Sequence, residues 1–347
     1  MKLYLEDGTS YAGEAFGHNG PATGEAVFAT GMTGYVESLT DPSFAGQILV
    51  CTYPLIGNYG VPSPDVFESS RIHVAGLVVS EYSANYSHHD ALQSLDSWLK
   101  AHKIPALTGV DTRAITKRLR ERGVMLGQLN RGKPGAFEDP NRENLVARVS
   151  PKEIRVYGDG PLKIVLVDCG SKENIVRSLV RPGITLTRVP WNYDFTNDEY
   201  HALVLSNGPG DPEMCGPTVT HIRTAMRAGK PILGVCLGNQ LLALAAGGST
   251  YKLKYGHRSQ NQPCIESATG RCYITSQNHG FAVDASTLSS GWSVWFTNAN
   301  DGSVEGIRHS TKPWRSVQFH PESSPGPTDT AWIFDEFLNG LPKQIRI

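Results

Sequence analysis

An excess of charge of either sign is missing from this sequence of 347 residues. It holds 32 Lys and Arg against 33 Asp and Glu, a formal net charge of −1. The densest basic stretch, residues 117–122, is typical of an exposed helix face. Binding to nucleic acid or to an acidic membrane surface needs concentrated positive charge, so we expect neither.

Long apolar runs are missing as well. No stretch approaches the roughly 20 apolar residues of a membrane-spanning helix, and residues 1–8 lack the apolar core of a signal peptide. Hydrophobic residues make up 39% and charged residues 19% of the chain, as in ordinary globular proteins. We therefore expect a cytoplasmic protein with no membrane association.

Paired cysteines and nucleotide-binding loops are also missing. The six cysteines form no CxxC pair, which argues against a zinc site and a disulfide scaffold. Each is either a small buried hydrophobe or a reactive thiol. No GxxxxGK[ST] loop is present, so we expect no ATP site and no cofactor in this chain.

The length and the local patterns fit two domains. Residues 1–150 mix short strand-like runs and turns, with a hairpin signal at Asp7-Gly8 and an amphipathic helix over 92–101, which predicts a smaller mixed α/β domain. Residues 151–162 are rich in Gly and charge and are predicted to be a linker. We predict an α/β domain over 163–347.

Strands and helices alternate in this second part. Apolar runs at 163–168, 184–189, 202–206 and 231–235 read as buried strands, and helices are expected at 174–179, 217–229, 237–246 and 328–338. Repeated β-α-β order predicts a mainly parallel sheet with helices on both faces.

The strongest chemical motif is Gly234-Val235-Cys236-Leu237-Gly238 between a strand and a helix. It has the G-x-nucleophile-x-G form of a strand-to-helix elbow, with Cys as the nucleophile. The glycines let neighbouring backbone pass close to a strained turn. The helix N-terminus favours thiolate over thiol. A buried structural Cys is the alternative, and the two glycines argue against it.

A nucleophilic Cys needs a base and a group that orients the base. The segment Phe319-His320-Pro321-Glu322 supplies both. If it is extended, side chains two apart point to the same side, so His320 can face Cys236 while Glu322 supports the far ring nitrogen. By itself the tripeptide His320-Pro321-Glu322 would be an ordinary loop.

A third motif, residues 206–212, follows the strand at 202–206. Ligands bind at the carboxyl ends of parallel strands, and a Gly-Pro-Gly turn can expose backbone N–H groups to an anion. The N–H groups of Gly208 and Leu237 are therefore candidates for stabilising the oxyanion that forms when a thiolate attacks an amide.

These three segments resemble the signature segments of the class I (triad) glutamine amidotransferases. Further segments resemble the small, glutamine-hydrolysing subunit of carbamoyl-phosphate synthetase: 34–35, 39–43, 52–60, 109–113 and 276–283. The resemblance spans nearly the whole chain. Asn239, beside the nucleophile, departs from a family that often carries His there.

The resemblance implies roles for individual residues. Cys236 is the nucleophile, His320 the base and acid, and Glu322 the group that orients it, with Gly208 and Leu237 at the oxyanion. It implies that glutamine is held around Ser43, Gly208, Gly210, Leu237, Gln240, Asn278, Gly280 and Phe281. Because Ser43 belongs to the first domain, the pocket is expected at the domain interface.

The resemblance also implies a partner. Ammonia released from glutamine passes to the large synthetase subunit, which uses ATP and Mg²⁺ to make carbamoyl phosphate for the pyrimidine or arginine pathway, and the first domain is expected to dock that subunit. Two alternatives remain: an amidotransferase serving another synthetase, and a catalytically silent docking subunit. The first-domain segments argue against the former and the intact triad argues against the latter.

Overall fold

The computed structural model describes residues 1–341, and the chain divides into two compact units. The first unit comprises Met1–Glu143 and Lys254–Ser259, and the second comprises Asn144–Leu253 and Gln260–Ile347. The predicted domain over 163–347 extends into residues 342–347, which lie outside the described residues. No helix within residues 1–341 has the length and apolar character that crossing a membrane requires.

The boundary between the units differs from the one expected from the sequence. Helix α4 (Leu145–Val149) belongs to the second unit and buries Val146 in its core. Within the expected linker, β11 (Arg155–Tyr157) pairs antiparallel with β13 (Ile184–Pro190). The Gly-rich composition therefore hid an edge strand of the second unit.

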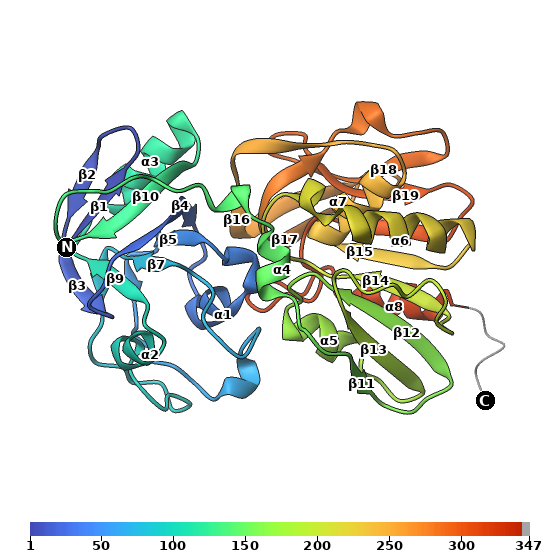
Figure 1. Cartoon of the computed structure of the whole chain (residues 1–347), viewed down its shortest axis with the longest axis horizontal. Helices are drawn as coiled ribbons and strands as arrows, with labels where there is room; N and C mark the ends of the chain where they lie inside the picture. The colour runs from blue at the N-terminus through green and yellow to red at the C-terminus, as the bar shows by residue number, and fades with distance from the viewer. Residues whose placement is uncertain (342–347) are drawn as a thin grey trace. The chain divides into compact units, whose positions relative to one another are not determined.

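The first unit is built on an eight-stranded mixed sheet in the order β2-β1-β10-β4-β5-β7-β9-β3 (Figure 1). The central strands β4, β5, β7 and β9 are parallel, and the outer pairs are antiparallel. The hairpin predicted at Asp7-Gly8 is confirmed, since β1 and β2 pair antiparallel around it. The strands are β1 (Lys2–Leu5), β2 (Ser10–Ala12), β3 (Glu14–Gly17), β4 (Ala22–Ala29), β5 (Gln47–Cys51), β7 (Gly76–Val78), β9 (Pro105–Thr108) and β10 (Met125–Asn130). Beside this sheet, β6 (Leu55–Ile56) and β8 (Glu81–Tyr82) form a short parallel pair.

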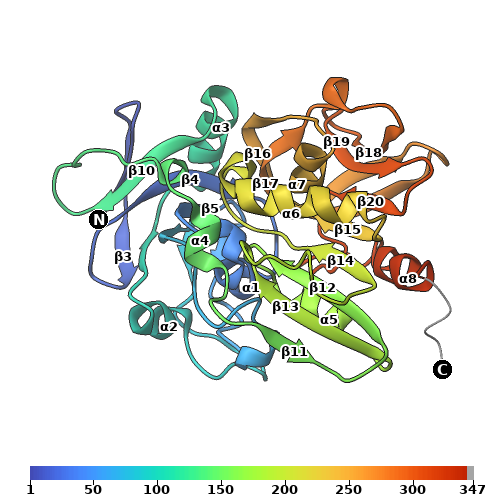
Figure 2. The same cartoon turned by 45° about the vertical axis from the view of Figure 1, so that its right-hand side comes forward.

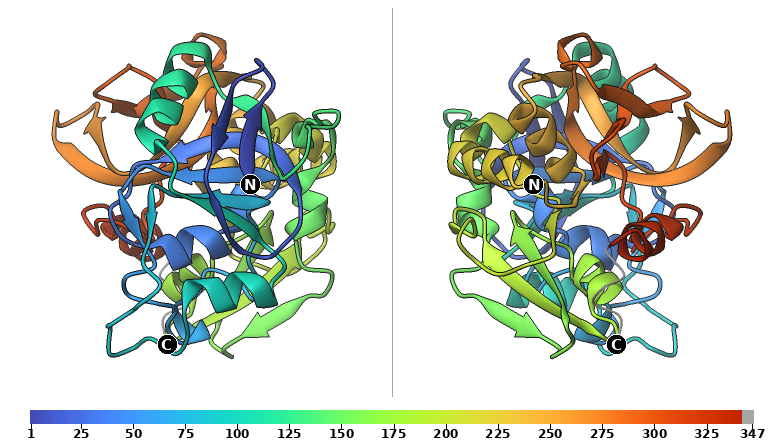
Figure 3. Two further views of the ribbon diagram at one scale, coloured as in Figure 1. Left: turned by 90° about the vertical axis from the view of Figure 1, so that its left-hand side faces the viewer. Right: turned by 90° about the vertical axis from the view of Figure 1, so that its right-hand side faces the viewer.

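Helices cover both faces of this sheet (Figure 3, left). Along β5, Ile48 and Val50 share a core with α3 (Thr112–Arg122). Leu49 between them packs on the opposite side, in the core of α1 (Tyr35–Thr40) and α2 (Leu95–Ala101). The alternation follows from the two-residue repeat of a strand, and every second residue of β5 serves the same helix layer.

The second unit contains a ten-stranded sheet in the order β11-β13-β12-β14-β15-β20-β19-β18-β16-β17. The parallel core that the sequence predicts is present as β13, β12, β14 and β15, and β20 adds a fifth parallel strand that was not predicted. The antiparallel strands β19, β18 and β16 extend it on one side, and the sequence analysis did not predict them. The remaining strands are β12 (Leu162–Asp168), β14 (Ala202–Leu205), β15 (Ile232–Val235), β16 (Thr250–Glu266), β17 (Cys272–Val283), β18 (Trp292–Asn298), β19 (Val304–His309) and β20 (Trp314–Val317).

The predicted helices lie on both faces of this second sheet (Figure 2 and Figure 3, right). Along β12, Ile164 and Leu166 pack with α5 (Glu173–Leu179) and α8 (Trp332–Asn339). The alternating residues Val165 and Val167 point to the opposite face, where they pack in the core of two further helices. These are α6 (Gly216–Arg227) and α7 (Leu237–Ala245). The carboxyl ends of β12, β14, β15 and β20 therefore meet at one margin, which we call the carboxyl edge.

Candidate active site

Cys236 stands at the carboxyl edge between β15 and α7. Its φ of 55° and ψ of −102° place a non-glycine residue in a strained left-handed region, and it caps the N-terminus of α7. Its N–H donates to the Val317 carbonyl at 2.8 Å, which fixes the turn to the end of β20. The predicted strand-Cys-helix elbow is therefore present, with its strain located at the sulfur-bearing residue.

Two glycines make this turn possible. A Cβ on Gly234 would lie 2.4 Å from the carbonyl oxygen of Gly238, and one on Gly238 would lie 2.3 Å from the carbonyl oxygen of Leu205. Both distances are far below van der Waals contact, and both carbonyl oxygens belong to the backbone, which cannot rotate away. The start of α7 can therefore lie against β14 and β15 only without side chains at these positions.

His320 and Glu322 follow β20, the parallel neighbour of β15. His320 Nδ1 lies 2.6 Å from Glu322 Oε1, and both side chains are buried. The sequence predicts this pairing from an extended segment, but β20 ends at Val317. The residues meet through a turn instead, in which the Ser323 N–H donates to the His320 carbonyl at 3.1 Å.

The other ring nitrogen of His320 is directed to the thiol. Its Nε2 is buried and makes no hydrogen bond of standard geometry within the described residues. Burial lowers the pKa of His320, but Glu322 first and the Cys236 sulfur second outweigh burial and raise that pKa to about 10. A protonated imidazole beside the sulfur favours thiolate over thiol.

Lys172 is a member of this site that sequence reasoning missed. It follows β12 at the carboxyl edge, and its buried Nζ lies 3.1 Å from Glu322 Oε1 and donates to the Ser323 carbonyl. Burial raises the pKa of Glu322, but Lys172 first and His320 second lower it to about 2. A position just after the first parallel strand is the signal that could have identified this lysine.

The two candidate oxyanion donors lie together. A Cβ on Gly208 would meet the Leu237 side chain at 2.8 Å and the Cys169 carbonyl oxygen at 2.2 Å, so the loop after β14 lies directly against the start of α7. Within the described residues neither backbone N–H donates a hydrogen bond. Unused N–H groups beside a nucleophile are available to a developing negative charge.

The residues expected to hold glutamine are partly brought together. Gln240 Nε2 donates to the Phe281 carbonyl at 2.8 Å, and the Cys236 sulfur lies 3.7 Å from the Asn278 carbonyl, so α7 and β17 meet at the nucleophile. Gly280 lies on β17 between these contacts, and Gly210 lies in the loop after β14.

Ser43 belongs to the first unit. Its backbone N–H donates to the Asp41 side chain at 2.8 Å in a short 3-10 helix, Pro42–Phe44. Its expected place beside the other glutamine-binding residues stays a prediction.

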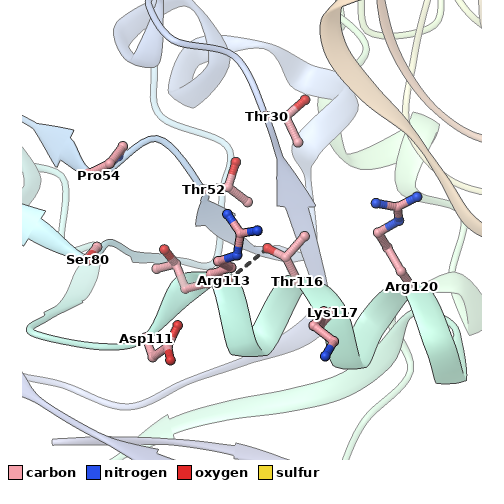
Figure 4. A pocket seen from close by; sticks show the side chains of 10 residues that line it. Thr30, Thr52, Pro54, Ser80, Asp111, Arg113, Thr116, Lys117 and Arg120 are labelled. Carbon is pink, nitrogen blue, oxygen red and sulfur yellow. Dashed lines mark hydrogen bonds between the residues drawn. The ribbon is translucent and has the colours of Figure 1, made fainter.

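A second candidate site lies within the first unit (Figure 4). A cavity of about 450 Å³ opens where β4, β5, β7 and β9 end, and α3 forms one wall. Figure 4 shows Arg113, Lys117 and Arg120 along α3, with Thr30 and Thr52 across from the helix. Within residues 1–341, Arg113 and Lys117 make no ion pair. The wall can thus accept a negatively charged group.

Comparison with known proteins identifies both parts of the chain. Residues 165–339 match the family described as glutamine amidotransferase class-I, and residues 3–129 match the carbamoyl-phosphate synthase small chain, CPSase domain. A solved glutamine amidotransferase from Thermotoga maritima is similar at 18% identity and a TM-score of 0.40, covering 47% of this chain and 77% of that one.

Two curated relatives cover almost all of this chain. The multifunctional protein CAD of Squalus acanthias is 52% identical over 97% of it. The human protein named carbamoyl-phosphate synthase [ammonia], mitochondrial, is 45% identical over 98% of it. The matched region spans only 16% and 24% of those relatives' own lengths. With an elbow cysteine, a buried His-Glu pair and a matching first unit, the chain belongs to the class I glutamine amidotransferases and carries the small-chain domain of carbamoyl-phosphate synthase.

Proposed function

We propose that this chain hydrolyses glutamine at Cys236 and supplies the ammonia to a carbamoyl-phosphate synthetase. The observation that carries the proposal is a strained Cys beside a buried, charge-supported His at the carboxyl edge, where the N–H groups of Gly208 and Leu237 donate no hydrogen bond within residues 1–341. That combination fits attack on an amide carbon, since it supplies a nucleophile, a proton carrier and an oxyanion site.

The chemistry proceeds through a thioester. The Cys236 thiolate attacks the side-chain amide carbon, and the N–H groups of Gly208 and Leu237 receive the oxyanion. Protonated His320 gives its proton to the departing nitrogen, so ammonia leaves and a γ-glutamyl thioester remains. Neutral His320 then takes a proton from water, whose oxygen attacks the thioester, and glutamate leaves as the thiol is restored.

Lys172 and Glu322 support the imidazole through these proton transfers. The ionised carboxylate stabilises the protonated ring, and the lysine keeps that carboxylate ionised despite its burial. The proposed proton transfers through Lys172, Glu322 and His320 therefore need no metal ion or organic cofactor bound to this chain.

The acceptor of the ammonia is a synthetase partner, which we propose to be the large subunit or a fused equivalent. Support comes from the small-chain domain and from relatives in which the matched region is a minor part of a longer protein. That partner would use ATP, Mg²⁺ and bicarbonate to form carbamoyl phosphate for pyrimidine or arginine synthesis. The expected cytoplasmic location stays a prediction.

The first unit is the proposed docking element, and the cavity beside α3 is its contact site. Arg113, Lys117 and Arg120 outnumber the single acidic residue of the lining, Asp111, so the cavity complements an acidic segment of the synthetase. The side chain of Asp111 is already engaged as the cap of α3, where it accepts from the Ala114 N–H at 2.9 Å.

A silent docking role is the second candidate, because one relative with 45% identity is named for ammonia. The buried cluster of Lys172, Glu322 and His320 argues against this role. Burying a Lys-Glu-His cluster costs desolvation free energy that the attraction between the charges does not always offset. Retention of the cluster is therefore expected only where the charges have a function. In a chain without glutaminase function, replacing all of these side chains with apolar ones would not be expected to reduce stability.

The decisive experiment measures glutamate release from glutamine by wild type and Cys236→Ala, each with and without the synthetase partner, ATP and bicarbonate. We expect slow release by wild type alone, acceleration by the partner and loss in the variant. Equal rates for the two chains would sink the proposal. Binding of the partner without glutamate release by either chain would instead favour the silent docking role.

Docking is tested by charge reversal on α3. We expect the double variant Arg113→Glu, Arg120→Glu to weaken binding of the synthetase at least about tenfold, with steeper salt dependence in wild type. Arg122→Glu is the matched control, since it lies on the same helix outside the cavity. Unchanged binding of the double variant would remove the cavity from the interface.

A further inference from the structure

One buried amide beside the nucleophile has no part in the chemistry described so far. Gln318 follows β20, is fully buried, and places Nε2 at 3.7 Å from the Cys236 sulfur. Its backbone N–H is already engaged, donating to the Glu305 carbonyl at 2.8 Å. A polar side chain buried this completely is expected to have a defined partner at each end.

The hydrogen bonds at the other end of Gln318 determine which atom faces the sulfur. Its Oε1 accepts from Asn239 Nδ2 and from Gln240 Nε2, both at 3.1 Å. Only a carbonyl oxygen can accept two amide donors, so the NH₂ group is the end that points at Cys236.

The two amides that hold Gln318 are themselves oriented. Asn239 Oδ1 accepts from the Ser316 hydroxyl at 2.9 Å, which turns its NH₂ towards Gln318. Gln240 donates to the Phe281 carbonyl at 2.8 Å as well, so its NH₂ uses both hydrogens. The chain Ser316–Asn239–Gln318–Cys236 therefore has a single consistent direction, with a donor delivered to the sulfur.

A second contact of the sulfur offers an acceptor. The Asn278 carbonyl lies 3.7 Å from Sγ and can receive the S–H of the neutral thiol. Once the proton has moved to His320 Nε2, the sulfur is an anion and needs donors instead. The amide of Gln318 meets that need without losing its own proton, and a hydrogen bond to a charged acceptor is stronger than one to a neutral thiol.

Building on the proposed glutaminase function, we propose that Gln318 is a catalytic residue that stabilises the Cys236 thiolate through its Nε2–H. Asn239 is its positioning residue. Position 239 requires one acceptor towards Ser316 and one donor towards Gln318, and the side chain of Asn or of His offers both.

The test reads the thiolate directly. The rate of Cys236 alkylation by iodoacetamide is measured against pH in the full chain, in a Cys272→Ser background, because Cys272 is the exposed cysteine among the described residues. In Gln318→Met we expect the midpoint to move up by about one pH unit and kcat/KM for glutamine hydrolysis to fall about tenfold through kcat. Thr218→Val is the control. Thr218 is a buried residue of α6, and the change removes the one hydrogen bond that its hydroxyl donates, to the Trp191 carbonyl.

A second variant keeps the test decisive if Gln318→Met does not fold. Asn239→Asp replaces the donor to Gln318 by an acceptor, and we expect the same upward shift, whereas Asn239→His should restore the wild-type midpoint. An unshifted midpoint in a folded Gln318→Met or Asn239→Asp chain would overturn the proposal. Alkylation needs no glutamine turnover, so this failure is distinguishable from failure of the glutaminase assignment, which Cys236→Ala tests.

Discussion

Each unit of the chain places parallel strands between helices, and in each the carboxyl ends of those strands carry polar side chains. In the first unit these are hydroxyls, which line an open cavity together with exposed cations of α3. In the second unit, Lys172, His320 and Glu322 are buried and contact one another. The corresponding margins of the two sheets thus suit the two proposed roles: exposed charges suit reversible binding of a partner, whereas buried and paired charges suit a side chain that carries protons.

The largest expected contrast comes from removing the proposed nucleophile. Cys236→Ala should reduce glutamate release at least about 10⁴-fold, because no other thiol stands at the elbow. Binding of the synthetase to the same variant should stay unchanged if docking belongs to the first unit. Loss of both properties together would break the division of labour between the units.

The second prediction compares the stability contribution of a buried ion pair in the second unit with that of an exposed ion pair in the first. Lys172→Met leaves Glu322 buried with less compensation and should lower the free energy of unfolding by about 3–5 kcal/mol. Lys100→Met, which breaks an exposed pair with Asp96 on α2 of the first unit, should cost less than about 0.5 kcal/mol. Urea unfolding of both variants measures this, and equal losses would contradict the assigned difference in burial.

Packing at the elbow gives a smaller expected effect. Gly238→Ala forces a Cβ against the Leu205 carbonyl and should destabilise the second unit by about 1–3 kcal/mol, despite the higher helix propensity of Ala. Gly216→Ala is the control, since a Cβ there meets nothing within 4 Å. If thermal unfolding places both variants at the same midpoint, the close approach of α7 to the sheet has no energetic consequence.

The pH dependence of stability tests the sign of each of the two pKa shifts. The pKa of His320 is raised from 6.5 to about 10, so its contribution is complete below pH 6.5 and is lost as the pH rises through 10. The pKa of Glu322 is lowered from 4.5 to about 2, so its contribution is complete above pH 4.5 and is lost as the pH falls through 2.

The stability difference between wild type and His320→Asn should therefore shrink above pH 6.5, and that for Glu322→Gln should shrink below pH 4.5. Denaturant titrations at several pH values measure both trends. A difference that grows with distance from neutrality would show that the signs of the two pKa shifts are reversed.

Sequence reasoning reached the local features of the fold. The strands and helices from 163 to 246, the elbow at Cys236 and the glycines around it follow from neighbouring residues, whose spacing and size fix a turn directly. The edge strand β11 escaped because its Gly-rich surroundings resemble a linker. The antiparallel strands β16, β18 and β19 were not predicted because polar residues interrupt them, so that they lack the continuous apolar runs of β12 and β15.

By itself the sequence predicted the family and the pairing of His320 with Glu322, both of which are confirmed, and it proposed Cys236 as the nucleophile. Tertiary structure alone placed Lys172 on Glu322 and turned the amide of Gln318 towards the sulfur. The physical reason is that β12, β15 and β20, distant along the chain, end at one sheet margin. Burial there excludes water, so the state of each charge and the direction of each amide are set by neighbours that no local pattern reveals.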